Sequence, residues 1–135
     1  MTLSRFFLAM GAALLLAVSA RADEAVIDRW YAALLAVDRT AISDLLSDDA
    51  RIRLDDLGIE QSKAEFVASM DEWQTAGAGA TIRHKVEKTE AGVVTVIACY
   101  DFPANDILMR ETFAIAGNAI TASSQAAVAE NCDAY

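Results

Sequence analysis

The sequence predicts an α+β domain in which N-terminal helices cover one face of a curved antiparallel sheet. Three observations support this. Apolar residues recur at helical spacing in the first half of the chain, and they alternate at period two from about residue 81 onward. The chain contains no internal repeat, low-complexity tract or linker. Helices followed by a run of sequential strands are typical of α+β domains with the helices on one side of the sheet.

Residues 1–22 have the features of a secretory signal peptide. Arg5 is followed by an apolar stretch at 6–18, and the segment ends in the small-x-small sequence ARA at 20–22. The apolar stretch is about 13 residues, whereas a membrane-spanning helix needs roughly 20. We therefore expect cleavage after Ala22 and an exported protein, periplasmic or secreted, with a single domain at 23–135. An uncleaved membrane anchor is the alternative.

The exported chain is strongly acidic. The net charge of the full sequence is −9, and removal of Arg5 and Arg21, with no acidic residue, makes it −11. Such a surface repels phosphate backbones and anionic lipids. We therefore expect neither nucleic acid nor, after cleavage, a membrane as a partner.

Two cysteines, Cys99 and Cys132, lie in the exported part. An even count in an oxidising compartment favours a disulfide. The chain-entropy model gives such a loop about 3.5 kcal/mol of stabilisation. Two free thiols, one of them reactive, are the alternative.

Three helices are expected in the first half of the chain. Asp23 can cap the first, whose apolar face would carry Val26, Ile27, Trp30, Tyr31, Leu34 and Leu35. Asp38 can cap a short second helix with Ile42, Leu45 and Leu46 buried. Ser62 and Glu65 form a capping box in front of the third, which carries Phe66, Val67, Met70 and Trp73.

The strands are expected around and after these helices. Ile52 and Leu54 alternate with arginines before an Asp-Asp-Leu-Gly turn, which indicates a strand entering a hairpin or loop at 50–62. Four further runs, at 81–90, 92–103, 106–117 and 119–129, alternate at period two. In the third of these, Glu111 shares a face with Ile107, Met109, Phe113 and Ile115.

Two segments, VIDRWYAALLAVDRTAISDLLSDDARIRL at 26–54 and GIEQSKAEFVASM at 58–70, resemble the nuclear transport factor 2-like superfamily. This superfamily includes ketosteroid isomerases and SnoaL-like cyclases. The resemblance covers nearly all of residues 23–135. It implies a cone in which the concave face of a curved sheet, closed by helices, holds a pocket, and a homodimer formed through the outer sheet face.

The resemblance also implies positions for catalytic groups. Glu111 resembles the late-strand acid of the family's isomerases, Trp30 occupies the position of their tyrosine, and Leu54 that of their aspartate base. Leucine cannot accept a proton, and Asp55 would point to the opposite side of a regular strand. The sequence therefore disfavours steroid-type isomerisation.

Glu111 and His84 are the candidate catalytic residues. Burial of Glu111 in a pocket would raise its pKa, and His84, on the inward face of its strand, could exchange protons with it. Alternatively, Glu111 pairs with Arg51, Arg53 or a symmetry mate, and His84 is an ordinary hydrogen-bonded residue. The residues expected to line the pocket are Trp30, Tyr31, Leu54, Tyr100, Met109 and Phe113.

Three functions fit these features. The first is a small-molecule-binding protein with an apolar ligand, and the second is a cofactor-free isomerase, dehydratase or hydrolase that uses Glu111 and His84. The third is a structural or partner-binding module without a pocket. No cofactor is expected. One histidine with scattered carboxylates lacks metal-ligand spacing, so no metal is expected either.

Overall fold

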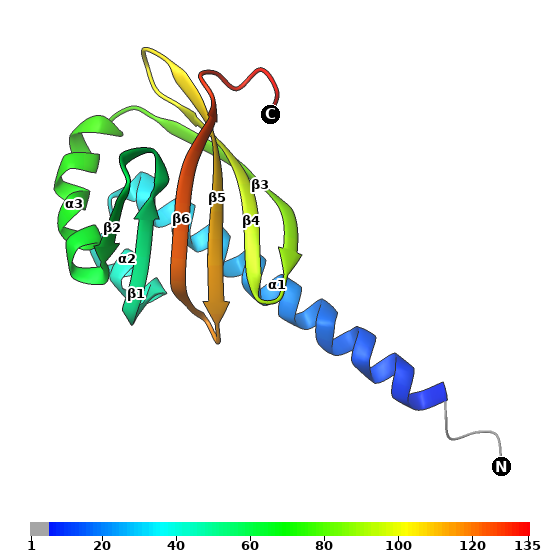
Figure 1. Ribbon diagram of the computed structural model, residues 1–135. Coiled ribbons are helices and arrows are strands. Elements are labelled where there is room, and N and C mark those ends of the chain that lie inside the picture. Colours follow the sequence, from blue (N-terminus) through cyan, green and yellow to red (C-terminus); the bar gives the residue numbers. More distant parts are fainter. Residues whose placement is uncertain (1–5) are drawn as a thin grey trace.

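Helices cover one face of a curved, unclosed six-stranded sheet in the computed structural model (Figure 1), which confirms the predicted fold class. The structure describes the backbone of residues 6–135 and the side chains of residues 20–135. The helices are α1 (Phe6–Ala36), α2 (Arg39–Leu45) and α3 (Lys63–Ala76), with a 3-10 turn, η1, at Asp55–Leu57. The strands are β1 (Leu46–Leu54), β2 (Ile59–Ser62), β3 (Thr81–Glu90), β4 (Val93–Asp101), β5 (Asp106–Ala116) and β6 (Ala119–Ala129).

The sheet is mixed, with the strand order β2-β1-β6-β5-β4-β3. Strands β3 to β6 form the expected antiparallel meander, and β1 pairs with β2 as an antiparallel hairpin. The one parallel pair joins β1 to β6, with Leu46 opposite Ile120 and Leu54 opposite Gln125. Short-range alternation cannot predict this pair, because its two strands are separated in the chain by α3 and four other strands.

The first helix differs from the prediction. It begins at Phe6 and continues through Ala22, so Asp23 lies inside α1 and does not cap its start. Alanine and leucine are abundant at 6–36 and no proline interrupts the segment, so helix can propagate across residue 23. Residues 1–5 of the predicted signal peptide lie outside the described part, and cleavage after Ala22 stays a prediction. No helix in the part of the chain that the structure describes is long and apolar enough to cross a membrane.

The other predicted helix starts are confirmed. The side chain of Asp38 accepts a hydrogen bond from the backbone N–H of Ala41 at 3.0 Å, which caps α2. The Ser62 hydroxyl accepts one from the backbone N–H of Glu65 at 3.2 Å and caps α3. These two caps fix the residues at which α2 and α3 begin.

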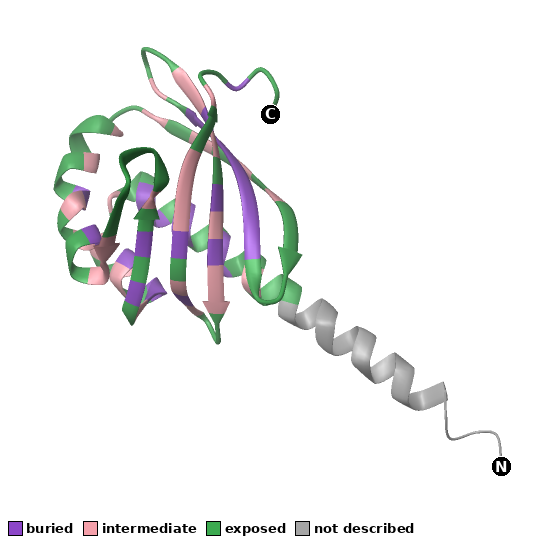
Figure 2. Cartoon of the chain, viewed as in Figure 1, coloured by how far each residue is buried: buried purple, intermediate pink, exposed green. Residues whose placement is uncertain are grey.

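The main core lies between the helices and the concave face of the sheet, and Figure 2 shows its buried positions on β1, β4, β5 and β6. Strand β4 is buried from Val94 to Tyr100 without alternation. The reason is that the outer face of β4 is buried too. Its residues Ile97 and Cys99 form a smaller cluster there with Leu108 and Cys132. The predicted disulfide joins Cys99 to Cys132 and attaches the C-terminal segment to this outer face.

Candidate functional site

Glu111 is fully buried and is held by two tyrosines. The Tyr31 hydroxyl, from α1, donates a hydrogen bond to Glu111 Oε2 at 2.6 Å, and the Tyr100 hydroxyl, from β4, donates to Oε1 at 2.6 Å. In the sheet, Glu111 stands opposite Val96 on one side and Gln125 on the other, so its side chain is directed into the concave face. The carboxylate is therefore an internal acceptor for two phenols that come from opposite layers of the fold.

Burial raises the pKa of the Glu111 carboxyl, because the charged form loses its hydration. Hydrogen bonds from Tyr100 and Tyr31, and the proximity of His84, act in the opposite direction and lower this pKa, but burial is the larger effect. Burial and the Glu111 carboxylate together raise the pKa of both tyrosines, so both phenols keep their protons. Glu111 is thus the member of the cluster that can change protonation state.

The protonation state of Glu111 decides what Tyr100 can offer to a neighbour. When Glu111 is ionised, the Tyr100 proton points to the carboxylate and only the lone pairs of the phenol oxygen are free. When Glu111 is protonated at Oε1, it can donate to Tyr100, whose own O–H then turns outward. The pair can therefore change Tyr100 from an acceptor to a donor without moving a heavy atom.

His84 does not form a hydrogen bond with Glu111 in the described part of the chain. Its Nε2 lies 2.8 Å from Oδ1 of Asp28, and its ring stacks on Tyr31 with the ring centroids 4.4 Å apart. The predicted acid–base pair is therefore separated by the Tyr31 ring. Two of the alternative partners of Glu111 are engaged elsewhere, since Arg51 lies near Glu60 and Arg53 pairs with Asp55.

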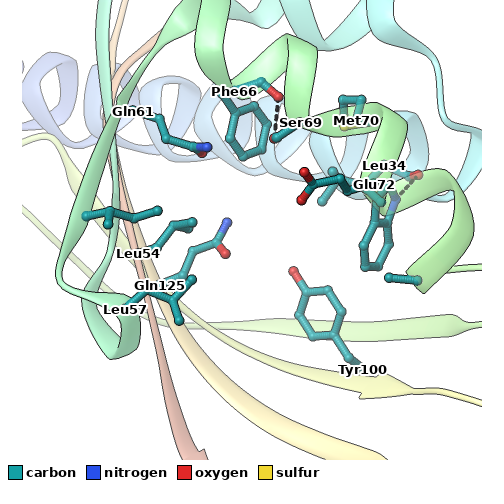
Figure 3. Close-up of a pocket in the computed structure, with 13 residues that line it drawn as sticks. Leu34, Leu54, Leu57, Gln61, Phe66, Ser69, Met70, Glu72, Tyr100 and Gln125 are labelled. Atoms are coloured by element: carbon teal, nitrogen blue, oxygen red, sulfur yellow. Dashed lines mark hydrogen bonds between the residues drawn. The ribbon is translucent and has the colours of Figure 1, made fainter.

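A cleft of about 330 Å³ lies between α3, the β1–β2 hairpin and the sheet. Tyr100 is the member of the tyrosine–glutamate cluster that lines it, and in Figure 3 its hydroxyl points into the open space. The apolar side chains that line the cleft are Leu34, Leu54, Leu57, Ile59, Phe66, Met70, Trp73 and Ala76, and the polar ones are Gln61, Ser69, Glu72, Tyr100 and Gln125.

The expected pocket residues divide into two groups. Leu54 and Tyr100 line the cleft. Trp30, Tyr31 and Phe113 are buried core residues behind it, and Met109 packs against the same core. Trp30 stacks on Phe66 with ring centroids 5.4 Å apart, and its indole N–H has no hydrogen-bond partner within the residues described.

Several lining residues were missed by the sequence analysis. Gln61, Glu72 and Gln125 carried no signal, because polar side chains are expected to face solvent. Trp73 was expected on the third helix, and no signal in the sequence placed it at the cleft. A possible metal-ligand grouping among the described residues, Cys99, Asp106 and Cys132, has both sulfurs joined in the disulfide.

Comparison with protein-family models and with curated proteins found no match. Solved structures do match. A SnoaL-like protein of unknown function from Burkholderia thailandensis is 13% identical with a TM-score of 0.67, over 82% of this chain and 96% of that one. The chain has the nuclear transport factor 2-like fold.

Two other proteins with the nuclear transport factor 2-like fold illustrate its range. IdmH from Streptomyces antibioticus, a candidate polyketide cyclase, is 13% identical with a TM-score of 0.67, over 78% of this chain and 91% of its own. A protein with a ketosteroid isomerase-like fold from Catenulispora acidiphila was solved in complex with trimethylamine. It is 15% identical with a TM-score of 0.59, over 75% of this chain and 83% of its own. At such low sequence identities the structural match establishes the fold alone. The function has to be inferred from the residues of the site itself.

The raised pKa of Glu111 predicts a specific pH dependence of stability. A carboxyl whose pKa is higher in the folded state stabilises the fold fully at pH values below its unfolded pKa of about 4.5, and this contribution is lost as pH rises through the folded pKa. The difference in free energy of unfolding between wild type and Glu111→Gln should therefore shrink as pH rises. Urea titrations from pH 4 to 8 measure it. A difference that stays flat or grows with pH would show that the tyrosine hydrogen bonds outweigh burial.

Proposed function

We propose that the protein is an exported small-molecule-binding protein whose ligand occupies the cleft beside α3 and contacts Tyr100. The observation that carries the proposal is the position of the Tyr100 hydroxyl, which faces the cleft and is bonded at 2.6 Å to the buried Glu111. Ligand sites are typically apolar concavities with a few fixed polar groups. Here the apolar surface comes from α3 and the β1–β2 hairpin, and the fixed polar group is Tyr100.

Three further features support the proposal. Trp73, which lines the cleft, is fixed by a hydrogen bond from its indole N–H to the carbonyl of Leu34 at 2.8 Å, so this part of the site is preformed. Proteins with the same fold include a candidate cyclase and a complex with trimethylamine. Export is proposed from residues 1–22, whose basic start, apolar stretch and ARA ending are those of a signal peptide.

Filling the cleft is expected to abolish ligand binding. Ala76 lines the cleft, and tryptophan at this position would fill it, whereas Ala68→Trp places the same side chain on α3 outside it. Small ketone, alcohol and amine fragments, screened by amide-resolved NMR on protein purified after expression of the full chain, should shift the Trp73 indole signal. We expect the shift in wild type and Ala68→Trp and no shift in Ala76→Trp. Binding that survives Ala76→Trp, or the absence of any binder, would contradict the proposal.

Acid–base catalysis is the second candidate, and the 2.6 Å bond between Tyr100 and Glu111 favours it. In this mechanism Tyr100 donates its proton to a bound molecule and receives one from Glu111. Leu54, at the end of β1, cannot act as a base, so any proton acceptor would have to be another group. Turnover of a ligand found by screening should be lost in both Glu111→Gln and Tyr100→Phe, with the fold retained. Turnover that survives both variants would exclude this mechanism.

A homodimer through the outer sheet face is part of the same proposal. Thr112, Ala114, Ala122 and Ser124 present small side chains there, which would allow two sheets to approach closely. Light scattering during size-exclusion chromatography should give twice the monomer mass for the wild-type protein. The Ala122→Arg variant should give the mass of a monomer. The remaining alternative is a structural or partner-binding module without a pocket. It would be favoured if the protein binds no ligand but binds a partner, either as a monomer or as a dimer.

A further inference from the structure

Among the polar groups that line the cleft, acceptors outnumber free donors, because most of the donor hydrogens already form hydrogen bonds inside the protein. Tyr100 donates to Glu111, and the Ser69 hydroxyl donates to the carbonyl of Phe66 at 2.6 Å. The Trp73 indole N–H donates to the carbonyl of Leu34. While Glu111 is ionised, Tyr100 therefore presents lone pairs towards a ligand. Ser69 presents lone pairs as well, and the indole of Trp73 presents its ring.

The remaining polar groups add mostly acceptors. Glu72 is a carboxylate, and in Figure 3 it points into the same open space as the Tyr100 hydroxyl and the Gln125 amide. Gln61 Oε1 is buried and accepts no hydrogen bond from the residues that the structure describes. The amide NH₂ groups of Gln61 and Gln125 are the only donors left to a ligand among the described lining side chains.

The electrostatics of the cleft favour positive charge. None of the described residues that line it is Lys, Arg or His, and Glu72 contributes a negative charge at the rim. The rings of Phe66, Trp73 and Tyr100 lie along it, and Trp73 and Tyr100 meet edge to face with centroids 6.1 Å apart. Aromatic faces attract cations, most strongly where the ring is indole and the cation is desolvated. An anionic ligand would find no countercharge here.

We propose that the cleft selects an organic cation, a protonated amine on a small apolar body, with its N–H directed to Tyr100 or Ser69 and its charge between Trp73 and Glu72. This inference rests on the proposed binding function and specifies its ligand class. The amine supplies what the site lacks, namely donors and positive charge, and its apolar part contacts Leu54, Leu57 and Ile59.

Three aromatic probes of similar size separate charge from shape. N,N-dimethylbenzylamine is protonated at pH 7, N,N-dimethylbenzamide is uncharged and has only an acceptor, and phenylacetate is an anion. NMR titration of protein purified after expression of the full chain should give about tenfold tighter binding for the amine than for the amide. Phenylacetate should not bind. Equal or tighter binding of the amide or of phenylacetate would overturn the inference.

A charge-matched pair of variants tests the role of Glu72. Glu72→Gln should weaken amine binding about fivefold, as expected for one nearby charge at a protein surface. It should leave the amide affinity unchanged. Glu130→Gln removes the same charge at an exposed residue outside the cleft and should alter neither affinity. Equal losses in both variants would mean that only net charge matters and would overturn the proposed contact with Glu72.

The outcomes also separate this inference from the proposed function. If neutral fragments bind in the cleft and the amine is not preferred, the organic-cation inference fails and the binding function stands. If neither the three probes nor the fragments shift the Trp73 indole signal, both proposals fail.

Discussion

Replacement of Glu111 by leucine is expected to lower the free energy of unfolding by about 3–5 kcal/mol at pH 4.5. The variant keeps a side chain of similar size but removes the carboxyl group to which Tyr31 and Tyr100 are both hydrogen-bonded. A buried donor or acceptor left without a partner costs about 1–3 kcal/mol, and here two phenols lose theirs. Burial raises the pKa of the Glu111 carboxyl, so at this acidic pH the relief of a buried charge compensates little.

A triple variant provides the control. If unpaired hydroxyls cause the loss, Tyr31→Phe and Tyr100→Phe in the Glu111→Leu background should restore most of the stability, since removing both partners of a buried hydrogen bond is nearly neutral. Glu111→Gln should lose less than Glu111→Leu, because an amide can accept from one tyrosine and donate to the other. Urea unfolding at pH 4.5 measures all three. A Glu111→Leu protein as stable as wild type would show that the carboxyl is not the shared acceptor.

Removal of the disulfide through Cys99→Ala with Cys132→Ala is expected to cost about 3.5 kcal/mol. The bond closes a loop with a sequence separation of 33 residues that contains β5, β6 and their turn, so its loss frees the unfolded chain. It also loosens the C-terminal segment that covers Ile97 and Leu108 on the outer face of the sheet. The midpoint of thermal unfolding should fall by more than about 10 °C.

Reduction of the wild-type protein provides the matched comparison. Reduced wild type and the double variant should unfold at nearly the same urea concentration, since both lack the same cross-link. The buried Cys99 should react with a thiol reagent only after reduction. If oxidised and reduced wild type have the same stability, the constraint on the unfolded chain contributes nothing.

Most of the fold could be predicted because its local signals agree with its packing. The Ser62–Glu65 capping box, the alternation in β3 and β5 and the paired cysteines each depend on neighbours a few residues away or on one simple count. The order of the strands in the sheet was harder to predict from the sequence. Nothing within β1 or β6 indicates that they pair in parallel, because the pairing depends on where the intervening chain returns. The predicted start of the first helix at Asp23 was wrong, because Asp23 can cap a helix only when the preceding residues are not helical.

The candidate site was only partly predictable. An acid in an apolar row correctly identified Glu111 as an inward-facing residue, since period two fixes the face of a strand. Its partners, Tyr31 and Tyr100, were expected only as pocket residues, because a side-chain contact across 80 positions leaves no local pattern. His84 shares the same face but bonds with Asp28 of α1, whose orientation depends on the packing of the whole helix.

The parallel pairing of β1 with β6 has a consequence for the order of folding. The hairpins β3–β4, β4–β5 and β5–β6 can form from neighbouring segments, but β1 and its partner β2 have no place in the sheet until β6 has been synthesised. Contacts of this separation slow folding, because a long loop must close before they form. The parallel topology therefore makes closure of the sheet at β1 a late step in folding.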